Sequence, residues 1–418
     1  FLIYHSIVCG HVGLRTGLNV IMKIKGVKTF ILRQDIGDKA FYSSQARFSV
    51  RSSMIVRIET DDGTVGWGEA GQYGPPEPPA ACIDEVLAPQ LIGRRADEPV
   101  RVFDDLYAFC RDFGQKGPYI EALSAVDIAL WDIWGQSLGR PVHALMGGAV
   151  RDRVAAYGTG CYYPDFFTDT DRMLKALADE TAALAKTGLT AMKVKIGLVP
   201  VEVDVERLSI VRGAFGPGFP LMADANHAYN AATAIRMGRA LEAENFLWFE
   251  EPVVPEDRDG YRRVRAALDV PIAGGECEYT RYGFRDLIGE GCVDIAQPDI
   301  CCAGGFSELQ KIVAIATSHG VMTVPHVWGS GIAVAAALQA IATLPLVPHT
   351  AVGVPLQNEP VIEFDRSPNP IRDELLETPF TPEDGCLPVP QGPGLGVVVN
   401  ESKLEEFTNY PSPGIGGG

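Results

Sequence analysis

The stretch Ala191-Met192-Lys193-Val194-Lys195-Ile196-Gly197 carries two lysines, two positions apart, in an apolar run. A β-strand alternates its side chains between two faces, so Lys193 and Lys195 would lie on the same face. Two ammonium groups on one face of a buried strand repel each other unless anionic groups lie beside them. The stretch therefore predicts a buried strand that points both lysines at a cluster of acids.

Acidic residues then follow at a nearly regular spacing, each at the end of an apolar run. They are Asp224, Glu250, Glu276 and Asp299, and His326 comes one further interval along the chain. One polar residue per strand-plus-helix unit is how a (β/α)8 barrel builds its active site at the carboxyl ends of its strands. The pattern predicts an α/β fold of the TIM-barrel type.

The apolar runs divide the chain into a barrel and a capping domain. We predict barrel strands at 154–158, 191–196, 220–223, 247–250, 271–273, 293–295, 321–323 and 361–363. Alternating runs at 23–34, 53–59 and 64–69 precede helical periodicity at 80–91, 100–113 and 120–137, which predicts an α+β N-terminal domain. Its loops 36–47 and 71–79 are rich in Gly, Ser or Pro and are candidate lids.

We therefore expect four segments. Residues 1–21 form a poorly packed peripheral extension, 22–150 the capping domain, and 151–371 the barrel with the active site. Residues 372–418 return to the capping domain and end in a loose tail.

Composition excludes several classes of partner. The chain has 418 residues, 46% of them hydrophobic, and a formal net charge of −17. Such an acidic chain is a poor partner for nucleic acid or an anionic membrane surface, whereas a bound cation can still admit an anionic substrate. The nine cysteines include no CxxC pair, which favours free thiols in a reducing cytoplasm.

Three carboxylates predict a metal site. Asp224, Glu250 and Glu276 would converge at the ends of neighbouring strands and repel one another unless a cation neutralises them. An all-carboxylate ligand set suits a hard divalent ion, Mg²⁺ first and Mn²⁺ second, and zinc would want His or Cys in the set.

The remaining strand-end residues predict acid–base chemistry. Lys195 is the candidate base, and we expect Lys193 and a divalent cation to lower its pKa. Asp299 and His326 are expected to form a dyad in which the carboxylate fixes the imidazole tautomer. The dyad and Lys195 would reach the substrate from opposite sides.

These motifs resemble a known family. The chain from about 22 to 399 is similar to the mandelate racemase subgroup of the enolase superfamily, in the mandelate racemase/muconate lactonizing enzyme family. The resemblance rests on Lys193-Val194-Lys195, Asp224-Ala225-Asn226, Glu250-Glu251-Pro252, Gly275-Glu276, Pro298-Asp299 and Pro325-His326.

The resemblance implies a role for each matched residue. Asp224, Glu250 and Glu276 match magnesium ligands, Lys195 the base, and Asp299 with His326 the dyad. Lys193 and a protonated Glu363 match groups that stabilise the substrate carboxylate, and Asn226 matches a residue that supports it. The resemblance also implies a homo-oligomer.

The implied chemistry is abstraction of the proton α to the carboxylate of a sugar acid or its lactone. Loss of a β-acyloxy group would open a lactone ring and give a 3-deoxy-2-keto acid, which is a cycloisomerase reaction. Loss of a β-hydroxyl would dehydrate a galactarate, glucarate or aldonate. We favour these two outcomes over racemisation or epimerisation.

Substrate specificity is expected to come from the lids. Arg47 and Tyr73, with Arg51 and Gln72 nearby, are candidate contacts for the distal end of the substrate, and His227 and Trp328 adjoin site residues. An ordinary surface arginine on a flexible loop is an equally good interpretation of Arg47.

Other classes of function fit the sequence less well. Cys161, Cys277 and Cys301 are possible nucleophiles, but the sequence places no histidine beside any of them. No nucleotide-binding glycine motif is present. A non-catalytic scaffold would be expected to lack a ligand or the base, whereas all these positions are filled.

Overall fold

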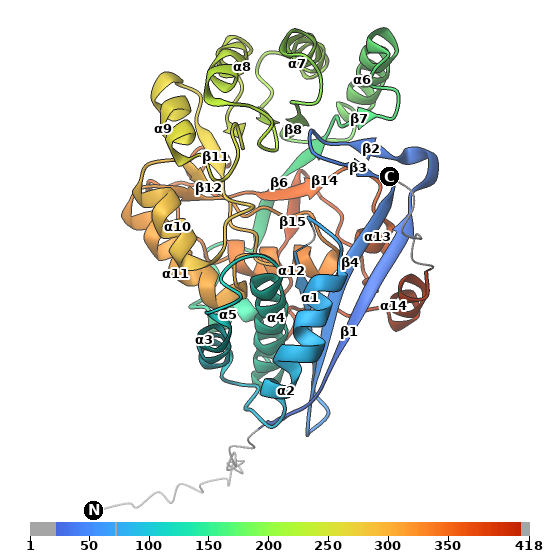
Figure 1. Cartoon of the computed structure of the whole chain (residues 1–418), viewed down its shortest axis with the longest axis vertical. Coiled ribbons are helices and arrows are strands. Elements are labelled where there is room, and N and C mark those ends of the chain that lie inside the picture. Colours follow the sequence, from blue (N-terminus) through green and yellow to red (C-terminus); the bar gives the residue numbers. More distant parts are fainter. Residues whose placement is uncertain (1–21, 72, 411–418) are drawn as a thin grey trace, which may run out of the picture.

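The computed structural model describes residues 22–71 and 73–410. The expected extension at 1–21, the tail at 411–418 and Gln72 lie outside the described residues. Two units are evident in Figure 1: a ring of strands surrounded by helices, and a long antiparallel sheet packed beside it.

The N-terminal unit is an antiparallel sheet covered by helices. Its strands are β1 (Ile24–Asp35), β4 (Val50–Thr60) and β5 (Val65–Ala70), in the order β1-β4-β5. Helix α4 (Pro118–Leu138) can cross β5 closely because Gly68 has no Cβ. A Cβ at this position would come 1.9 Å from the Ala125 carbonyl oxygen. The other helices are α1 (Glu77–Ala81), the π-helical η2 (Cys82–Leu87), α2 (Ala88–Leu91), α3 (Pro99–Cys110) and α5 (Val142–Leu145).

The second unit is a parallel barrel, which confirms the predicted fold class. Its sheet runs in the order β13-β12-β11-β10-β9-β8-β6-β14. The strands are β6 (Arg153–Gly160), β8 (Met192–Lys195), β9 (Leu221–Asp224), β10 (Phe249–Glu250), β11 (Ile272–Gly274), β12 (Ile295–Ala296), β13 (Met322–Thr323) and β14 (Ile362–Asp365).

Helices alternate with these strands and form the outer layer (Figure 1). They are α6 (Thr170–Leu184), α7 (Val201–Phe215), α8 (Ala231–Ala243), α9 (Arg258–Ala267), α10 (Thr280–Gly289), α11 (Gly305–Ser318) and α12 (Gly331–Ile341). Within the described residues, no helix is both long and apolar enough to cross a membrane.

Strand alternation separates an apolar layer from a charged layer inside the barrel. The apolar layer takes one side chain from each strand or from the residue before it: Tyr157, Ala191, Met222, Trp248, Ala273, Ile295, Met322 and Val361. Two residues further along β8, β9, β10 and β14 stand Lys193, Asp224, Glu250 and Glu363, which therefore share the inner face. The charged groups all collect at the carboxyl ends of the strands.

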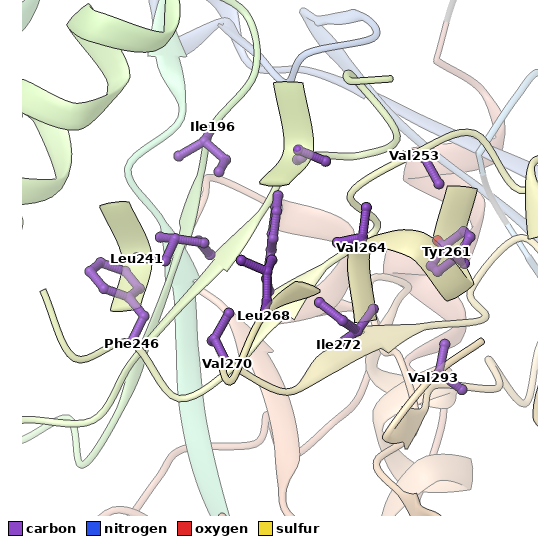
Figure 2. Close-up of a cluster of buried hydrophobic side chains, with 14 of the residues drawn as sticks. Ile196, Leu241, Phe246, Val253, Tyr261, Val264, Leu268, Val270, Ile272 and Val293 are labelled. Carbon is purple, nitrogen blue, oxygen red and sulfur yellow. The ribbon is translucent and has the colours of Figure 1, made fainter. Parts of the chain in front are cut away.

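The opposite face of the strands packs against the outer helices. Figure 2 shows part of this layer, with Ile196, Ile272 and Val293 from the strand regions meeting Leu241 and Val264 from α8 and α9. The apolar face of each helix covers the sheet, so hydrophobic burial fixes the strand positions on which the site depends.

The first lid loop is tied to the barrel by a small sheet. Short strands β2 (Phe41–Tyr42) and β3 (Arg47–Phe48) pair with each other, and β2 also pairs with β7 (Tyr163–Pro164), which follows the first barrel strand. The 3₁₀ turn η1 (Gly37–Lys39) precedes them. Backbone pairing thus orders a segment that its composition predicted as a loop.

The C-terminal segment contacts both units. We expected it to return to the capping domain. Before it does so, β15 (Cys386–Pro388) pairs antiparallel with the first residues of β6, whose backbone groups are not used by the neighbouring barrel strands. Beyond it, α14 (Glu401–Thr408) lies beside β1, and Leu404 and Phe407 join the core that contains Leu32. Helix α13 (Pro370–Glu374) lies between β14 and this segment.

A buried carboxylate joins the two units. Glu69, at the end of β5, is fully buried and accepts hydrogen bonds from the Ser53 hydroxyl at 2.5 Å, from the Ser330 amide and hydroxyl at 2.9 and 2.5 Å, and from the Ala333 amide at 3.0 Å. Ser330 and Ala333 are at the N-terminus of α12, where a negative charge is favoured. Burial nevertheless raises the pKa of Glu69.

We predict that Glu69→Gln lowers the free energy of unfolding by about 2–4 kcal/mol, because an amide replaces one acceptor with a donor and leaves buried donors unpaired. Chemical denaturation would measure the change, with Glu206→Gln on the exposed side of α7 as the matched control. Equal stability of the two variants would show that the carboxylate does not fasten the capping domain to the barrel.

Candidate active site

Three carboxylates converge at the carboxyl ends of β9, β10 and β11. One oxygen each from Asp224, Glu250 and Glu276 lies within 4.8 Å of the other two, and all three residues are buried. Glu276 Oε2 has no hydrogen-bond partner among the described residues. A buried, unpartnered oxygen in an all-oxygen donor set fits a hard divalent cation such as Mg²⁺.

Lys193 lies at the centre of the charged layer. Its ammonium group is 2.5 Å from Glu250 Oε1, 3.1 Å from Glu363 Oε1 and 3.7 Å from Asp224 Oδ2, and the side chain is fully buried. Burial disfavours the charge, but Glu250 and Glu363 hold the pKa of Lys193 well above its usual range. Lys193 is therefore a fixed positive charge.

The pKa of Lys195 was expected to be lowered by Lys193 together with a bound divalent cation. Its ammonium donates to Asp224 Oδ2 and, at 3.0 Å, to Asn226 Oδ1. Burial and Lys193 lower the pKa of Lys195, but the contact with Asp224 outweighs both and raises it. The prediction did not include a carboxylate in direct contact, and a lower pKa with the cation bound stays a prediction.

Asp299 and His326 form the expected pair. His326 Nδ1 lies 2.8 Å from Asp299 Oδ2, and Nε2 lies 3.5 Å from Glu276 Oε2. Burial lowers the pKa of His326, but Glu276 and the hydrogen bond with Asp299 raise it to about 10. The neighbouring carboxylates thus favour the protonated form of the imidazole.

Tyr73 contacts this pair directly. Its hydroxyl donates to Asp299 Oδ2 at 2.9 Å and lies 2.8 Å from His326 Nδ1. Tyr73 also lines the cavity, so its contact with the substrate stays a prediction. Tyr73 belongs to the second lid loop, so the capping domain supplies a polar group to a pair that is built on the barrel.

The neighbours of Glu363 favour its ionised form, whereas the resemblance implied a protonated one. Burial favours the neutral acid, but Lys193 and His326 lower the pKa of Glu363, and the Thr159 hydroxyl donates to Oε1. Glu276 shows the opposite behaviour, because burial and the neighbouring Glu251 raise its pKa well above the usual range. The prediction did not anticipate an ammonium group 3.1 Å from Glu363.

Two groups that support the carboxylates were not predicted. Glu250 Oε2 accepts from the Trp248 indole at 3.1 Å and from the Gln297 amide at 2.7 Å. Each donor lies two positions before a predicted site residue and so on the same inward face. Trp248 precedes Glu250 by two positions, and Gln297 precedes Asp299 by two. That period of two is a signal that could have revealed them.

The groups face a cavity of about 190 Å³ between barrel and lids. Its lining combines polar strand-end residues with an aromatic wall: Ser43, Gln45, Ala46, Phe48, Tyr73, Tyr162, Lys195, Asn226, His227, Glu276, Cys277, His326 and Trp328. Lid residues Ser44 and Gln45 donate to the backbone of the β9 end, at Ala225 O (2.7 Å) and Asn226 O (2.8 Å).

Only some of the candidate specificity residues line the cavity. His227 and Trp328 line the cavity as predicted. Arg47 does not, because its guanidinium makes two hydrogen bonds to Asp165, at 2.9 and 2.8 Å, on the exposed side of the lid. Arg51 is buried, with its guanidinium 3.9 Å from the ring centroid of Trp328.

The cysteine nucleophile hypothesis gains no support. Cys161 and Cys301 are buried, and burial raises the pKa of both thiols well above the usual value. A protonated, buried thiol is a poor nucleophile.

Comparisons with known proteins agree with this geometry. The chain matches the family model "Mandelate racemase / muconate lactonizing enzyme, N-terminal domain" at 30–147 and "Enolase C-terminal domain-like" at 176–403. It is 44% identical over 392 residues to D-galactarolactone cycloisomerase of Agrobacterium fabrum, covering 94% of this chain and 100% of that one.

Two further proteins are similar over most of their length. Arabinonate dehydratase of Saccharolobus solfataricus is 36% identical, covering 85% of this chain and 90% of the relative. The crystal structure of the 3,6-anhydro-D-galactonate cycloisomerase from Zobellia galactanivorans superposes with a TM-score of 0.81 at 39% identity, covering 92% and 99%.

We predict that Mg²⁺ stabilises the folded chain through the three carboxylates. At about 100 times its dissociation constant, a ligand specific for the native state adds about 2.7 kcal/mol to the free energy of unfolding. Glu276→Gln should abolish most of this gain, and Glu256→Gln, exposed after β10, should keep it. Thermal melts with and without Mg²⁺ would test this, and an unchanged gain in Glu276→Gln would contradict the assignment.

Proposed function

The chain belongs to the mandelate racemase / muconate lactonizing enzyme family of the enolase superfamily. From this premise we propose that it abstracts the proton α to the carboxylate of a sugar acid. The substrate is a sugar-acid lactone of the D-galactarolactone type, whose ring then opens by β-elimination. The observation that carries the proposal is the placement of two proton-transfer groups, Lys195 and His326, on one cavity from strands β8 and β13, with four strands between them.

Lys195 is positioned to accept the α proton. Asn226 and Asp224 orient its amine, and once Lys195 has lost its own proton the lone pair can take the hydrogen from carbon. The electron pair of that C–H bond moves onto the substrate carboxylate, where negative charge grows. Lys193, buried and fixed in its charge, is placed to stabilise it.

Asp224, Glu250 and Glu276 would hold Mg²⁺, which when bound supplies a Lewis-acid charge that acidifies the α carbon. The electron pair then returns toward the β carbon and expels the ring acyloxy group as a carboxylate. The open-chain enol takes up a proton at carbon and becomes a 3-deoxy-2-keto acid. Protonated His326, held by Asp299, can donate that proton.

The wall of the cavity favours a ring-containing monoacid over an open-chain diacid. Among the described residues that line it, Lys195 is the only lysine or arginine. Arg47 is paired with Asp165, and Arg51 lies 3.7 Å from Asp365. Phe48 and Trp328 instead present packed aromatic edges, with ring centroids 4.9 Å apart. At that wall a second carboxylate would find Arg51 already paired with Asp365, whereas the ring of a lactone is uncharged.

Dehydration of an aldonate is the second candidate. It is supported by the similarity to arabinonate dehydratase and by the protonated His326, since a leaving hydroxide needs a proton whereas a leaving carboxylate does not.

We predict that the enzyme with Mg²⁺ in D₂O converts a sugar-acid lactone into a deuterated 3-deoxy-2-keto acid, followed by proton NMR over a panel of lactones and open-chain acids. Lys195→Ala should lower the rate by about 10²–10⁴-fold, and His326→Asn should impair turnover similarly. Reaction of open-chain acids alone would favour the dehydratase, and absence of α-proton exchange across the panel would count against enolisation.

We further predict that Tyr73→Phe lowers kcat by about 10-fold with little change in KM, because the lost hydroxyl contacts Asp299 and His326. Steady-state kinetics would measure the split. Tyr42→Phe, on the lid strand β2, is the matched control. A rise in KM at constant kcat would instead return Tyr73 to the predicted role of a substrate contact.

A further inference from the structure

A second cluster of potential ligands lies next to the three-carboxylate set. It consists of His227, Glu251 and Cys277, whose ligand atoms all lie within 4.8 Å of one another. The residues follow the carboxyl ends of β9, β10 and β11, the same strands that bring Asp224, Glu250 and Glu276 together. The two sets share no residue.

The backbone holds this cluster in place. The His227 amide donates to the Glu251 carbonyl at 2.8 Å, and the Glu251 amide donates to the Ala273 carbonyl at 3.0 Å on the neighbouring strand. Across this link, His227 Nδ1 lies 3.1 Å from Glu251 Oε2. The imidazole and the carboxylate therefore need no large movement to face a common ion.

The cluster opens onto the cavity of the active site. His227 and Cys277 are half-buried and line that cavity, and Glu251 is only 1% exposed and lies behind them. An ion entering from the cavity would meet imidazole and thiol first and the buried carboxylate last. Its remaining coordination position would face the cavity.

The charge of the region also favours a second cation. The buried carboxylates around the carboxyl ends of the strands belong to Asp224, Glu250, Glu251, Glu276, Asp299, Glu363 and Asp365, and the buried basic side chains among them are those of Lys193, Lys195 and Arg51. One divalent ion in the three-carboxylate set would leave negative charge in excess.

We propose that His227, Glu251 and Cys277 form a separate site for a borderline or soft divalent ion such as Zn²⁺, and that its occupation obstructs the substrate cavity. Nitrogen, oxygen and sulfur donors suit Zn²⁺, whereas the three-carboxylate set suits Mg²⁺. Binding replaces the thiol proton, which is released to solvent, with the metal–sulfur bond. Three protein ligands leave one position for water or for a substrate oxygen.

Cadmium tests the site without reference to activity, because a Cd²⁺–thiolate bond gives a charge-transfer absorption in the ultraviolet. The full chain would be titrated with Cd²⁺ in excess Mg²⁺, which occupies the carboxylate set. We expect one equivalent of absorbing Cd²⁺ per chain. Cys277→Ser should abolish the band, and Cys386→Ser on β15 should leave it unchanged.

Two variants separate this site from the magnesium site. Glu276→Gln should keep the Cd²⁺ band, and His227→Asn should weaken Cd²⁺ binding by at least about 10-fold, as expected for loss of a ligand. A band that persists in Cys277→Ser would overturn the proposal, and so would a band that disappears in Glu276→Gln.

Inhibition by Zn²⁺ provides an independent test of the proposed site. At saturating Mg²⁺, Zn²⁺ should inhibit the wild-type enzyme. A chelator followed by fresh Mg²⁺ should reverse this inhibition. Each variant is compared with its own zinc-free rate, so a change in basal activity does not affect the result. If Cys277→Ser remains as sensitive as wild type, Zn²⁺ acts by replacing Mg²⁺, and the proposed obstruction is wrong.

Discussion

The structure depends on the burial of opposite charges at one end of a barrel. Lys193 is fully buried, and it is tolerated there because Glu250 and Glu363 lie within 3.1 Å of it. Those carboxylates depend in turn on the lysine and on donors such as the Gln297 amide. The apolar layer beneath them fixes the strands, so hydrophobic packing holds this charged layer together.

The capping domain completes a site that the barrel alone leaves open. Glu69 fastens the domain to the start of α12, and from the lids Gln45 bonds the backbone after β9 while Tyr73 reaches the Asp299–His326 pair. A lid that touches the proton-transfer groups links closure of the cavity to their geometry. In the proposed chemistry, these polar contacts between the units would couple substrate entry to proton transfer.

The proposed chemistry and the second ligand cluster follow from the same strand ends. Inward positions carry the oxygen donors of Asp224, Glu250 and Glu276, and the residues just beyond them carry the nitrogen, oxygen and sulfur donors of His227, Glu251 and Cys277. The aromatic wall of Phe48 and Trp328 closes the far side of the cavity. Charge at one end and aromatic surface at the other suit a ring-containing monoacid.

The sequence by itself determined the barrel, its strands and the shared face of Lys193, Asp224, Glu250 and Glu363, because a strand's period of two and the recurring strand–helix unit are local properties. Only the tertiary structure decided the contact of Lys195 with Asp224, the contact of Glu363 with Lys193, the diversion of Arg47 to Asp165 and the contact of Tyr73 with the dyad. These depend on distances between groups far apart in the chain, and Coulomb energy and desolvation vary with those distances and not with sequence spacing.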